Sequence, residues 1–246
     1  LPLVVATLGA AGAPPAAAEW GCAVVASLAA TSSEGRRAVA LAGGAAAVCG
    51  AMAERRASPR LQEAGCRALA NLASERALVA PLAHAGAIER VCAAAKAHAG
   101  DARVAEEACA ALANFAVGGA VPCQRIYEAG GGLAALAAMG SHGKRGVVLQ
   151  EGCAALANLT QHAAAAEQLA AAGAGRVIAG AMSEHLGNER LQIFGVLALD
   201  NLGYSGLDLD EQSEASGGGG GGGGLSSVAA ARKAERLKRT QLDVAA

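Results

Sequence analysis

Apolar residues recur along this chain at the spacing of one helix face. They fall at intervals of 4, 4 and 3 residues in one stretch, and the same slots are apolar or small in three others: Val104, Ala108, Leu112 and Phe115; Leu61, Gly65, Leu69 and Leu72; Val148, Gly152, Leu156 and Leu159; Leu191, Gly195, Leu199 and Leu202. This is the period of an amphipathic α-helix. The pattern predicts four copies of one long helix, and the small residue in the second slot is expected to let a neighbouring helix approach closely.

The starts and ends of helices are also marked. Ser58 and Pro59 stand before Leu61, and Asp101 stands before Val104; serine or aspartate caps a helix N-terminus, and proline suits the first turn. Glycine, which ends a helix readily because it adopts the left-handed conformation, recurs at intervals of 43, 44 and 43 residues at Gly43, Gly86, Gly130 and Gly173. Each unit should therefore hold three helices, at residues 75–84, 87–98 and 103–116 in one of them.

The predicted long helices share an asparagine near their end. The four copies are Asn71, Asn114, Asn158 and Asn201, spaced 43, 44 and 43 residues apart, and a weaker copy places Ser27 44 residues before Asn71. The surrounding line reads Ala-Leu-Ala-Asn-Leu at residues 68–72 and again at 155–159. A period of about 40 to 47 residues is typical of a stacked helical solenoid of the armadillo or HEAT kind.

Three helices per unit, a glycine turn before the second and an Ala-Leu-x-Asn-Leu line in the third closely resemble the armadillo repeat family over residues 1–205. The resemblance implies an all-α fold, a right-handed α-solenoid with three helices in each unit of about 43 residues. Val4, Pro15 and Gly21 align with Val48, Pro59 and Gly65 at a shift of 44. We therefore expect an incomplete first repeat, about four further units, and a chain that is a fragment.

Composition supports helices and excludes some partners. Aromatic residues make up 2% of the 246 residues and apolar residues 53%, which suits closely packed helices better than a β-sandwich. The net charge of -1 provides no field that would attract nucleic acid, and no direct nucleic-acid partner is expected. Residues 1–18 are uncharged, but Pro2, Pro14 and Pro15 interrupt them, so neither a signal peptide nor a transmembrane segment is expected.

The chain holds seven cysteines, and four of them share one repeat slot: Cys22, Cys66, Cys109 and Cys153. Neighbouring helices lie about 8 to 10 Å apart, whereas a disulfide requires Cα atoms within about 7 Å. These cysteines are predicted to be reduced and buried, and with no Cys-x-x-Cys pair present, neither a metal nor another cofactor is expected. A reducing compartment follows, the cytoplasm, with the nucleus as the alternative.

Beyond residue 205 the repeat pattern stops. Residues 206–227 are predicted to be a disordered linker, acidic at first and then containing eight consecutive glycines from Gly217 to Gly224. Residues 228–246 form a basic tail that could be a short helix, with a solvated end as the favoured interpretation. Docking on an acidic partner, or folding back onto the array as an internal competitor, is the alternative.

The asparagine series is the main candidate for function. In armadillo proteins the matching asparagine lines a concave groove of third helices and hydrogen-bonds the main chain of an extended partner. The resemblance therefore implies a partner-binding groove that contains Asn71, Asn114, Asn158, Asn201 and Arg67. The alternative is structural, since each carboxamide has donors and an acceptor that can hold a loop or helix end of its own unit.

The slot four residues before the asparagine argues against two known kinds of partner. Importin-α-like proteins place tryptophan there, but this chain has Ala23, Arg67, Ala110, Ala154 and Leu197. Trp20 is out of that register, so binding of nuclear localisation signals is not expected. Arg67 stands almost alone, without the row of basic groove residues that β-catenin-like arrays use for acidic partners. The identity of a protein or peptide partner stays open.

The histidines and glycines do not indicate catalysis. His98, His142 and His185 are spaced 44 and 43 residues apart, with Arg55 in the same slot one unit earlier, which predicts capping of helix C-termini. The glycine run lacks a following Gly-Lys-[Ser/Thr], so it is no phosphate loop. A non-enzymatic protein-interaction scaffold is predicted. The alternatives are the repeat portion of a larger protein with a separate catalytic module, such as a ubiquitin ligase, and a component of a structural rod or ciliary assembly.

Overall fold

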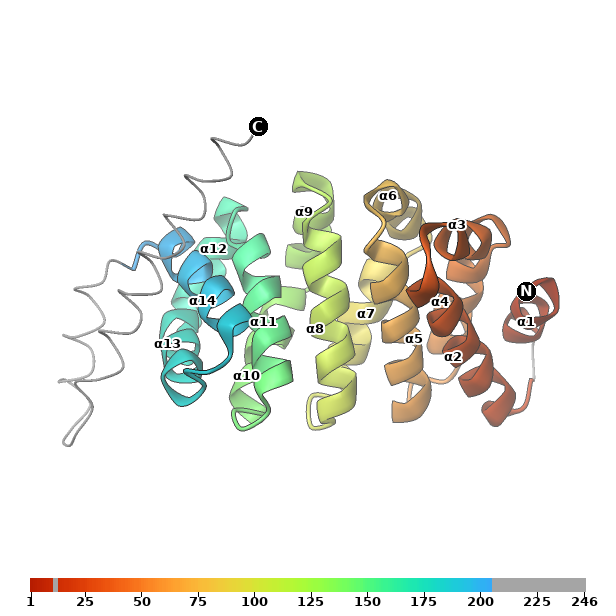
Figure 1. Cartoon of the computed structure of the whole chain (residues 1–246), viewed down its shortest axis with the longest axis horizontal. Helices are drawn as coiled ribbons and strands as arrows, with labels where there is room; N and C mark the ends of the chain where they lie inside the picture. The colour runs from red at the N-terminus through yellow and green to blue at the C-terminus, as the bar shows by residue number, and fades with distance from the viewer. Residues whose placement is uncertain (11–12, 205–246) are drawn as a thin grey trace.

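The computed structural model describes residues 1–10 and 13–204 of the chain. The predicted linker and the predicted basic tail lie outside the described residues. The described part consists of fourteen α-helices and contains no β-strand (Figure 1), as the composition and the apolar periodicity predicted.

The helices fall into three sets that recur once per unit. The first helices are α3 (Ser33–Leu41), α6 (Arg76–His84), α9 (Ala120–Glu128) and α12 (Ala163–Ala171). The second helices are α1 (Pro2–Gly9), α4 (Gly44–Glu54), α7 (Ala87–Ala97), α10 (Gly131–Ser141) and α13 (Ala174–Glu184). The third helices are α2 (Pro15–Thr31), α5 (Pro59–Ala73), α8 (Ala102–Ala116), α11 (Gly146–Leu159) and α14 (Glu189–Asn201).

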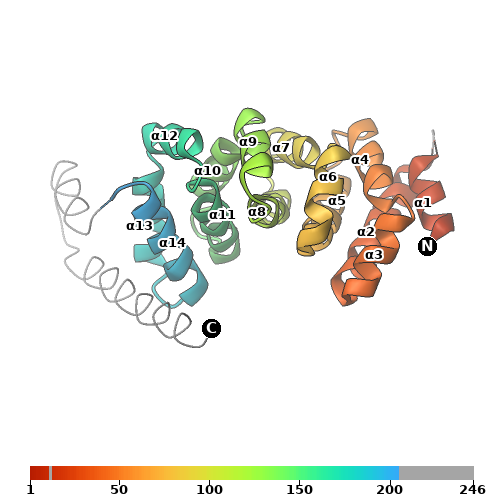
Figure 2. The ribbon, with the colours of Figure 1, turned by 90° about the horizontal axis from the view of Figure 1, so that it is seen from above.

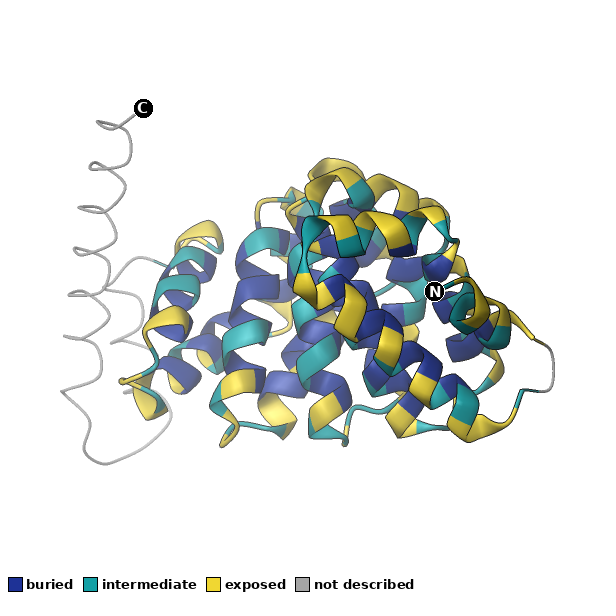
Figure 3. Ribbon diagram, turned by 45° about the vertical axis from the view of Figure 1, so that its right-hand side comes forward, coloured by how far each residue is buried: buried dark blue, intermediate teal, exposed yellow. Residues whose placement is uncertain are grey.

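The third helices stand side by side in one row along the molecule (Figure 1). The most extensive contacts between elements are those between consecutive third helices, and the second helices pack behind them. Seen from above, the array is bent, and the row of third helices lies on the inner side of the bend (Figure 2). Buried residues follow one another from helix to helix as a single core that reaches from Leu8 to Leu199 (Figure 3).

The predicted helix boundaries are confirmed within one residue at most ends. The segments expected at 75–84, 87–98 and 103–116 are α6, α7 and α8. Ser58 caps α5, since its hydroxyl accepts a hydrogen bond from the Leu61 amide at 3.3 Å. Asp101 caps α8 by accepting from the amides of Arg103 and Val104. The four turn glycines have φ between 66° and 80°, the left-handed region.

The small residue in the second slot receives a side chain from the second helix of its own unit. A Cβ atom added to Gly152 would lie 2.5 Å from Cγ of Met139, and one added to Gly65 would lie 2.5 Å from Sδ of Met52. Gly195 faces Met182 in the same way. The unit with alanine in the slot, Ala108, has alanine in the methionine slot as well, at Ala95. In each of these units, the size of the residue on the second helix is therefore matched to the size of the residue that it faces on the third helix.

We predict that Gly152→Ala lowers the free energy of unfolding by about 1 to 3 kcal/mol, because the added methyl overpacks the contact with Met139. Combining it with Met139→Ala reproduces the alanine pair of the other unit, so the double variant should lose less than the sum of the two single losses. Urea unfolding followed by circular dichroism measures this. Gly140→Ala, where no atom lies within 4 Å of the added Cβ, is the control, and additive losses would contradict the pairing.

All seven cysteines are buried and free, which confirms the prediction made for Cys22, Cys66, Cys109 and Cys153. Burial raises the pKa of the Cys109 and Cys153 thiols to about 12 and that of Cys49 to about 11. The thiolate is the reactive form of cysteine. These side chains therefore act as small apolar core residues.

Raising the pH from about 8 to 10 should destabilise the chain. The ordinary thiol pKa is 9.0, so cysteines of the unfolded chain lose protons in this range while the buried thiols of the folded chain keep theirs, and stability falls as pH rises. Urea midpoints across the range test this. A Cys109→Ala, Cys153→Ala variant should show a shallower fall, and an identical slope would contradict the assignment.

Candidate functional site

The four asparagines occupy the same point of α5, α8, α11 and α14, in the last turns of each helix. Each carboxamide nitrogen donates a hydrogen bond to a backbone oxygen of the preceding third helix. The pairs are Asn71 to Ala26 (3.0 Å), Asn114 to Ala70 (2.9 Å), Asn158 to Ala113 (3.0 Å) and Asn201 to Ala157 (3.1 Å). The asparagine series therefore links neighbouring units, and the expected structural tie within one unit is wrong on this point.

These bonds leave part of each carboxamide available. An amide side chain has two N–H donors and one acceptor oxygen, and the bond to the preceding helix uses one donor. Among the residues that the structure describes, nothing donates to the carboxamide oxygen of Asn71, Asn114 or Asn158. These three side chains are half-buried, and Asn201 is exposed. The arrangement is therefore compatible with both a structural tie and a surface for a partner.

Arg67 lies one helical turn before Asn71 on α5, between two carboxylates. Its Nη2 lies 2.5 Å from Oε1 of Glu63 on the same helix, and its Nε lies 2.6 Å from Oε1 of Glu107 on α8. The hydrogen bond to Glu107 is the main cause of the raised pKa of the Arg67 guanidinium. Burial raises the pKa of the Glu107 carboxyl in spite of Arg67. Arg67 is thus part of an ion-pair bridge between two units.

The same region of the third helices is acidic. Glu107 and Glu151 each precede the asparagine of their helix by seven residues, two turns along one face. Glu106 stands next to Glu107, and neither Glu106 nor Glu151 forms an ion pair with any residue in the described ranges. Comparison of equivalent slots singled out Arg67 but did not predict its two carboxylate partners, although Glu63, four residues before Arg67 on the same helix, was a signal for one of them.

The histidine series forms a second set of ties between units. His98, His142 and His185 are the C-cap residues of α7, α10 and α13, so their predicted position is confirmed. The predicted capping of their own helix ends by the rings is wrong. Their rings bond the loop of the preceding unit: Nε2 lies 2.8 Å from the Arg56 oxygen, 3.0 Å from that of Ala99 and 2.9 Å from that of Gly143, respectively. Arg55, in the same slot, donates to the Ala13 oxygen at 2.6 Å.

We expect His142→Ala to lower the free energy of unfolding by about 0.5 to 1.5 kcal/mol, the net contribution of one hydrogen bond. Helix content should stay unchanged, because the ring bonds a neighbouring unit. Urea unfolding gives the difference. His84→Ala is the matched control, since the exposed His84 ring bonds Ala80 of its own helix; equal losses in the two variants would refute the tie between units.

The described residues were also compared with the requirements of a metal site and of a membrane-spanning helix. No group of three or more His, Cys, Asp or Glu side chains in the described ranges could hold a metal ion. No single helix of the described part is both long and apolar enough to cross a membrane. Two pairs of consecutive helices would be long and apolar enough together, but each pair is sharply bent at its junction.

No protein-family model matches the sequence, and no curated protein is similar to it. Solved structures are similar. The designed armadillo repeat protein YIII(Dq.V1)4CPAF in complex with peptide (KR)4 matches with a TM-score of 0.72 and 20% identity over 95% of this chain and 98% of that one. Computationally designed armadillo repeat proteins for modular peptide recognition match with the same score and identity over 95% and 99%.

An engineered protein of the Northeast Structural Genomics Consortium is similar too, with a TM-score of 0.71 and 22% identity over 87% of this chain and 84% of that one. The chain therefore has the armadillo repeat fold, as the resemblance of its Ala-Leu-x-Asn-Leu lines implied. At these identities the likeness concerns the fold.

Proposed function

We propose that this chain is a non-enzymatic scaffold that binds an extended segment of another protein along the row of third helices. The observation that carries the proposal is the series of carboxamides at one repeat slot, in which Asn71, Asn114 and Asn158 each keep an acceptor oxygen and one N–H that no described residue uses. Asn201 donates to both the Ala157 oxygen and the Thr160 hydroxyl. Armadillo arrays present extended surfaces because every unit adds the same face to the next. The designed armadillo repeat proteins of similar structure were made for peptide recognition, and one of them holds a peptide.

The spacing of the units suits an extended chain. Neighbouring packed helices lie about 8 to 10 Å apart, and an extended strand advances about 3.2 to 3.4 Å per residue. Two to three residues of a bound segment would therefore pass each unit, so that its backbone groups meet one asparagine after another. Main-chain hydrogen bonds of this kind contribute affinity without requiring a particular sequence.

The charges of the third helices favour a segment that carries lysine or arginine. Glu106 and Glu151 have no ion-pair partner in the described part of the chain, and Glu63 and Glu107 share the single Arg67. A basic segment would neutralise this excess. The missing tryptophan ladder still argues against the way in which importin-α-like proteins hold basic side chains, so the contact would be through carboxylates. We place the scaffold in the cytoplasm or nucleus, which the seven free cysteines support.

We expect Asn114→Ala combined with Asn158→Ala to weaken binding of a fluorescein-labelled (KR)4 octapeptide by about tenfold, since it removes two hydrogen-bond partners of about 0.5 to 1.5 kcal/mol each. Fluorescence anisotropy measures the affinity. Because these residues also tie units together, thermal unfolding must show that the variant is folded at the assay temperature.

A second variant separates charge from fold. Glu106→Gln with Glu151→Gln removes no hydrogen bond or ion pair between units among the described residues. It should weaken binding of the same peptide and lower the salt dependence of that binding. Arg103→Gln, at the exposed start of α8, is the control for general electrostatic effects. Unchanged affinity in both the asparagine and the glutamate variants would refute the groove.

A further inference from the structure

We infer that a basic segment of this chain's own C-terminal tail, residues 232–239, binds along the third helices and competes there with a basic partner segment. The inference rests on the proposed function, because it assigns an internal occupant to the same surface. The tail lies outside the described residues. The charge of the described surface and the length of the connecting chain carry the inference.

The surface that would receive the tail has an excess of carboxylates. Two adjacent slots of the third helices hold four glutamates: Glu63 and Glu106 in one slot, Glu107 and Glu151 in the next. All four are half-buried, and Arg67 is their only ion-pair partner in the described part of the chain. Arg60 and Arg103, at exposed helix starts, form no ion pair with them. Four carboxylates therefore share one guanidinium, and a bound cation would be only partly screened by salt.

The tail has the opposite charge over a matching length. Residues 232–239 contain one acid and five cations, which are Arg232, Lys233, Arg236, Lys238 and Arg239. An extended segment of eight residues spans about 23 Å. The distance from α11 across α8 to α5 is about 16 to 20 Å, since neighbouring packed helices lie about 8 to 10 Å apart. The basic segment is therefore long enough to pass all four glutamates.

The connecting chain suits this placement. Tyr204 is held at the end of α14, where its amide donates to the Leu199 oxygen at 3.0 Å, and 23 residues, numbers 205–227, separate it from the tail. A glycine-rich chain of that length has a root-mean-square end-to-end distance of about 24 to 29 Å. From the end of α14, Glu151 and Glu107 lie about 15 and 22 Å away by the spacing and rise of the helices. The linker therefore reaches both.

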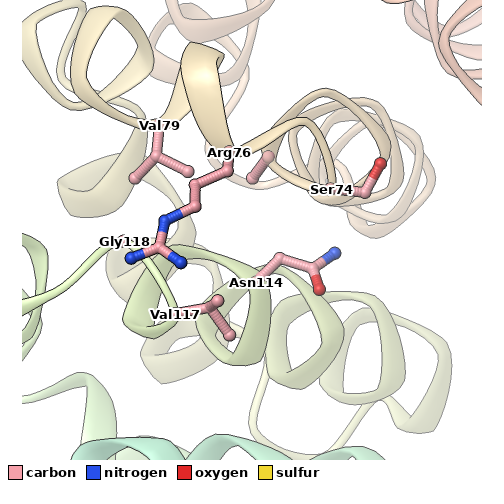
Figure 4. Close-up of a pocket in the computed structure, with 7 residues that line it drawn as sticks. Ser74, Arg76, Val79, Asn114, Val117 and Gly118 are labelled. Atoms are coloured by element: carbon pink, nitrogen blue, oxygen red, sulfur yellow. The ribbon is translucent and has the colours of Figure 1, made fainter. Parts of the chain in front are cut away.

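The asparagine end of this surface remains open to a main chain. A pocket of about 70 Å³, lined by Arg76 and Asn114 among others, lies where α5 and α8 end and α6 begins. Figure 4 shows the Arg76 guanidinium pointing away from the Asn114 carboxamide. The carboxamide oxygen and second N–H are therefore available to the backbone of a bound tail. As an exposed cation, Arg76 repels lysine and arginine, which favours their placement along the glutamates.

An internal occupant turns the binding of an outside segment into a competition. A tethered tail has an effective concentration of about 1 mM near the surface that it can reach. A tail that binds on its own with a Kd of about 0.1 mM then weakens the binding of an outside basic segment about tenfold. Because the linker starts from α14, the first cations of the tail lie near Glu151 and the last near Glu63.

The first experiment detects the contact without any added peptide. A nitroxide is attached to the isotopically labelled full chain at Thr240→Cys, since the seven native cysteines are buried and protected. We expect NMR amide signals around Glu63 and Glu107 to broaden, and those of the exposed Gly50 and Gly140 on the second helices to stay sharp.

Neutralising the tail in the same chain should abolish the broadening. The neutralised tail carries glutamine at all five cations, Arg232, Lys233, Arg236, Lys238 and Arg239. Sharp signals around Glu63 and Glu107 in the original tail would overturn the inference, whether or not (KR)4 binds; pairing of the tail with the acidic linker would give this result. Broadening that appears only when a spin-labelled chain is mixed with a separate isotopically labelled chain would assign the contact to a second copy and overturn the internal one.

The second experiment measures the competition. Fluorescence anisotropy compares binding of fluorescein-labelled (KR)4 to the full chain and to the chain with the neutralised tail, and we expect the latter to bind about tenfold more tightly. The control replaces five exposed cations without ion pairs by glutamine: Arg56, Arg76, Lys144, Arg145 and Arg176. This equal charge change should give at most about a twofold gain at 0.15 M salt. Equal gains in the two variants would overturn the competition.

The outcomes separate the two proposals. A (KR)4 peptide that binds both tails equally, with no broadening in the spin-labelled chain, refutes the tail contact and leaves the groove. A peptide that binds neither chain refutes the groove as proposed, and the spin label then decides the tail contact by itself. Broadening without tighter binding to the neutralised chain would mean that tail and peptide do not share a surface, which overturns the inference.

Discussion

Each unit of this protein depends on the contact between its third helix and the third helix of the unit before it. The apolar faces of these helices cannot be buried within a single unit, so only stacking removes them from water. The asparagine carboxamide adds a directional hydrogen bond to this apolar contact. Asn114 donates to the Ala70 oxygen, a backbone carbonyl that already accepts within its own helix end and has a second lone pair. The rings of His98, His142 and His185, at the C-terminal ends of the second helices, likewise bond a backbone oxygen of the preceding unit.

The ties between units bear on the proposed binding as well as on stability. A carboxamide held by one N–H loses little further freedom when its other polar atoms meet a partner, and such preorganisation lowers the entropic cost of association. Arg67 is held in the same sense by Glu63 and Glu107. Structural and partner-binding roles of these side chains are therefore compatible.

Much of the fold could be predicted because its determinants are local. The spacing from Val104 to Phe115, the caps Ser58 and Asp101, and the turn glycines each act within a few residues. The pairing of Gly152 with Met139 was only half predicted. A small residue predicts that another helix approaches closely at that point, but the local sequence does not indicate which helix provides the opposing side chain.

The candidate site was predicted as a set of positions and not as a set of contacts. By itself, the sequence determined the unit, its three helices, its repeat length and the slot that every asparagine occupies, since periodicity and capping are properties of neighbouring residues. Only the tertiary structure decided that Asn158 bonds Ala113, that Arg67 lies between carboxylates, and that Arg76 and Asn114 border one pocket. Apart from Glu63, which lies four residues before Arg67 on the same helix, the partners in these pairs come from different helices, up to 45 residues apart, and stacking of the units brings them together.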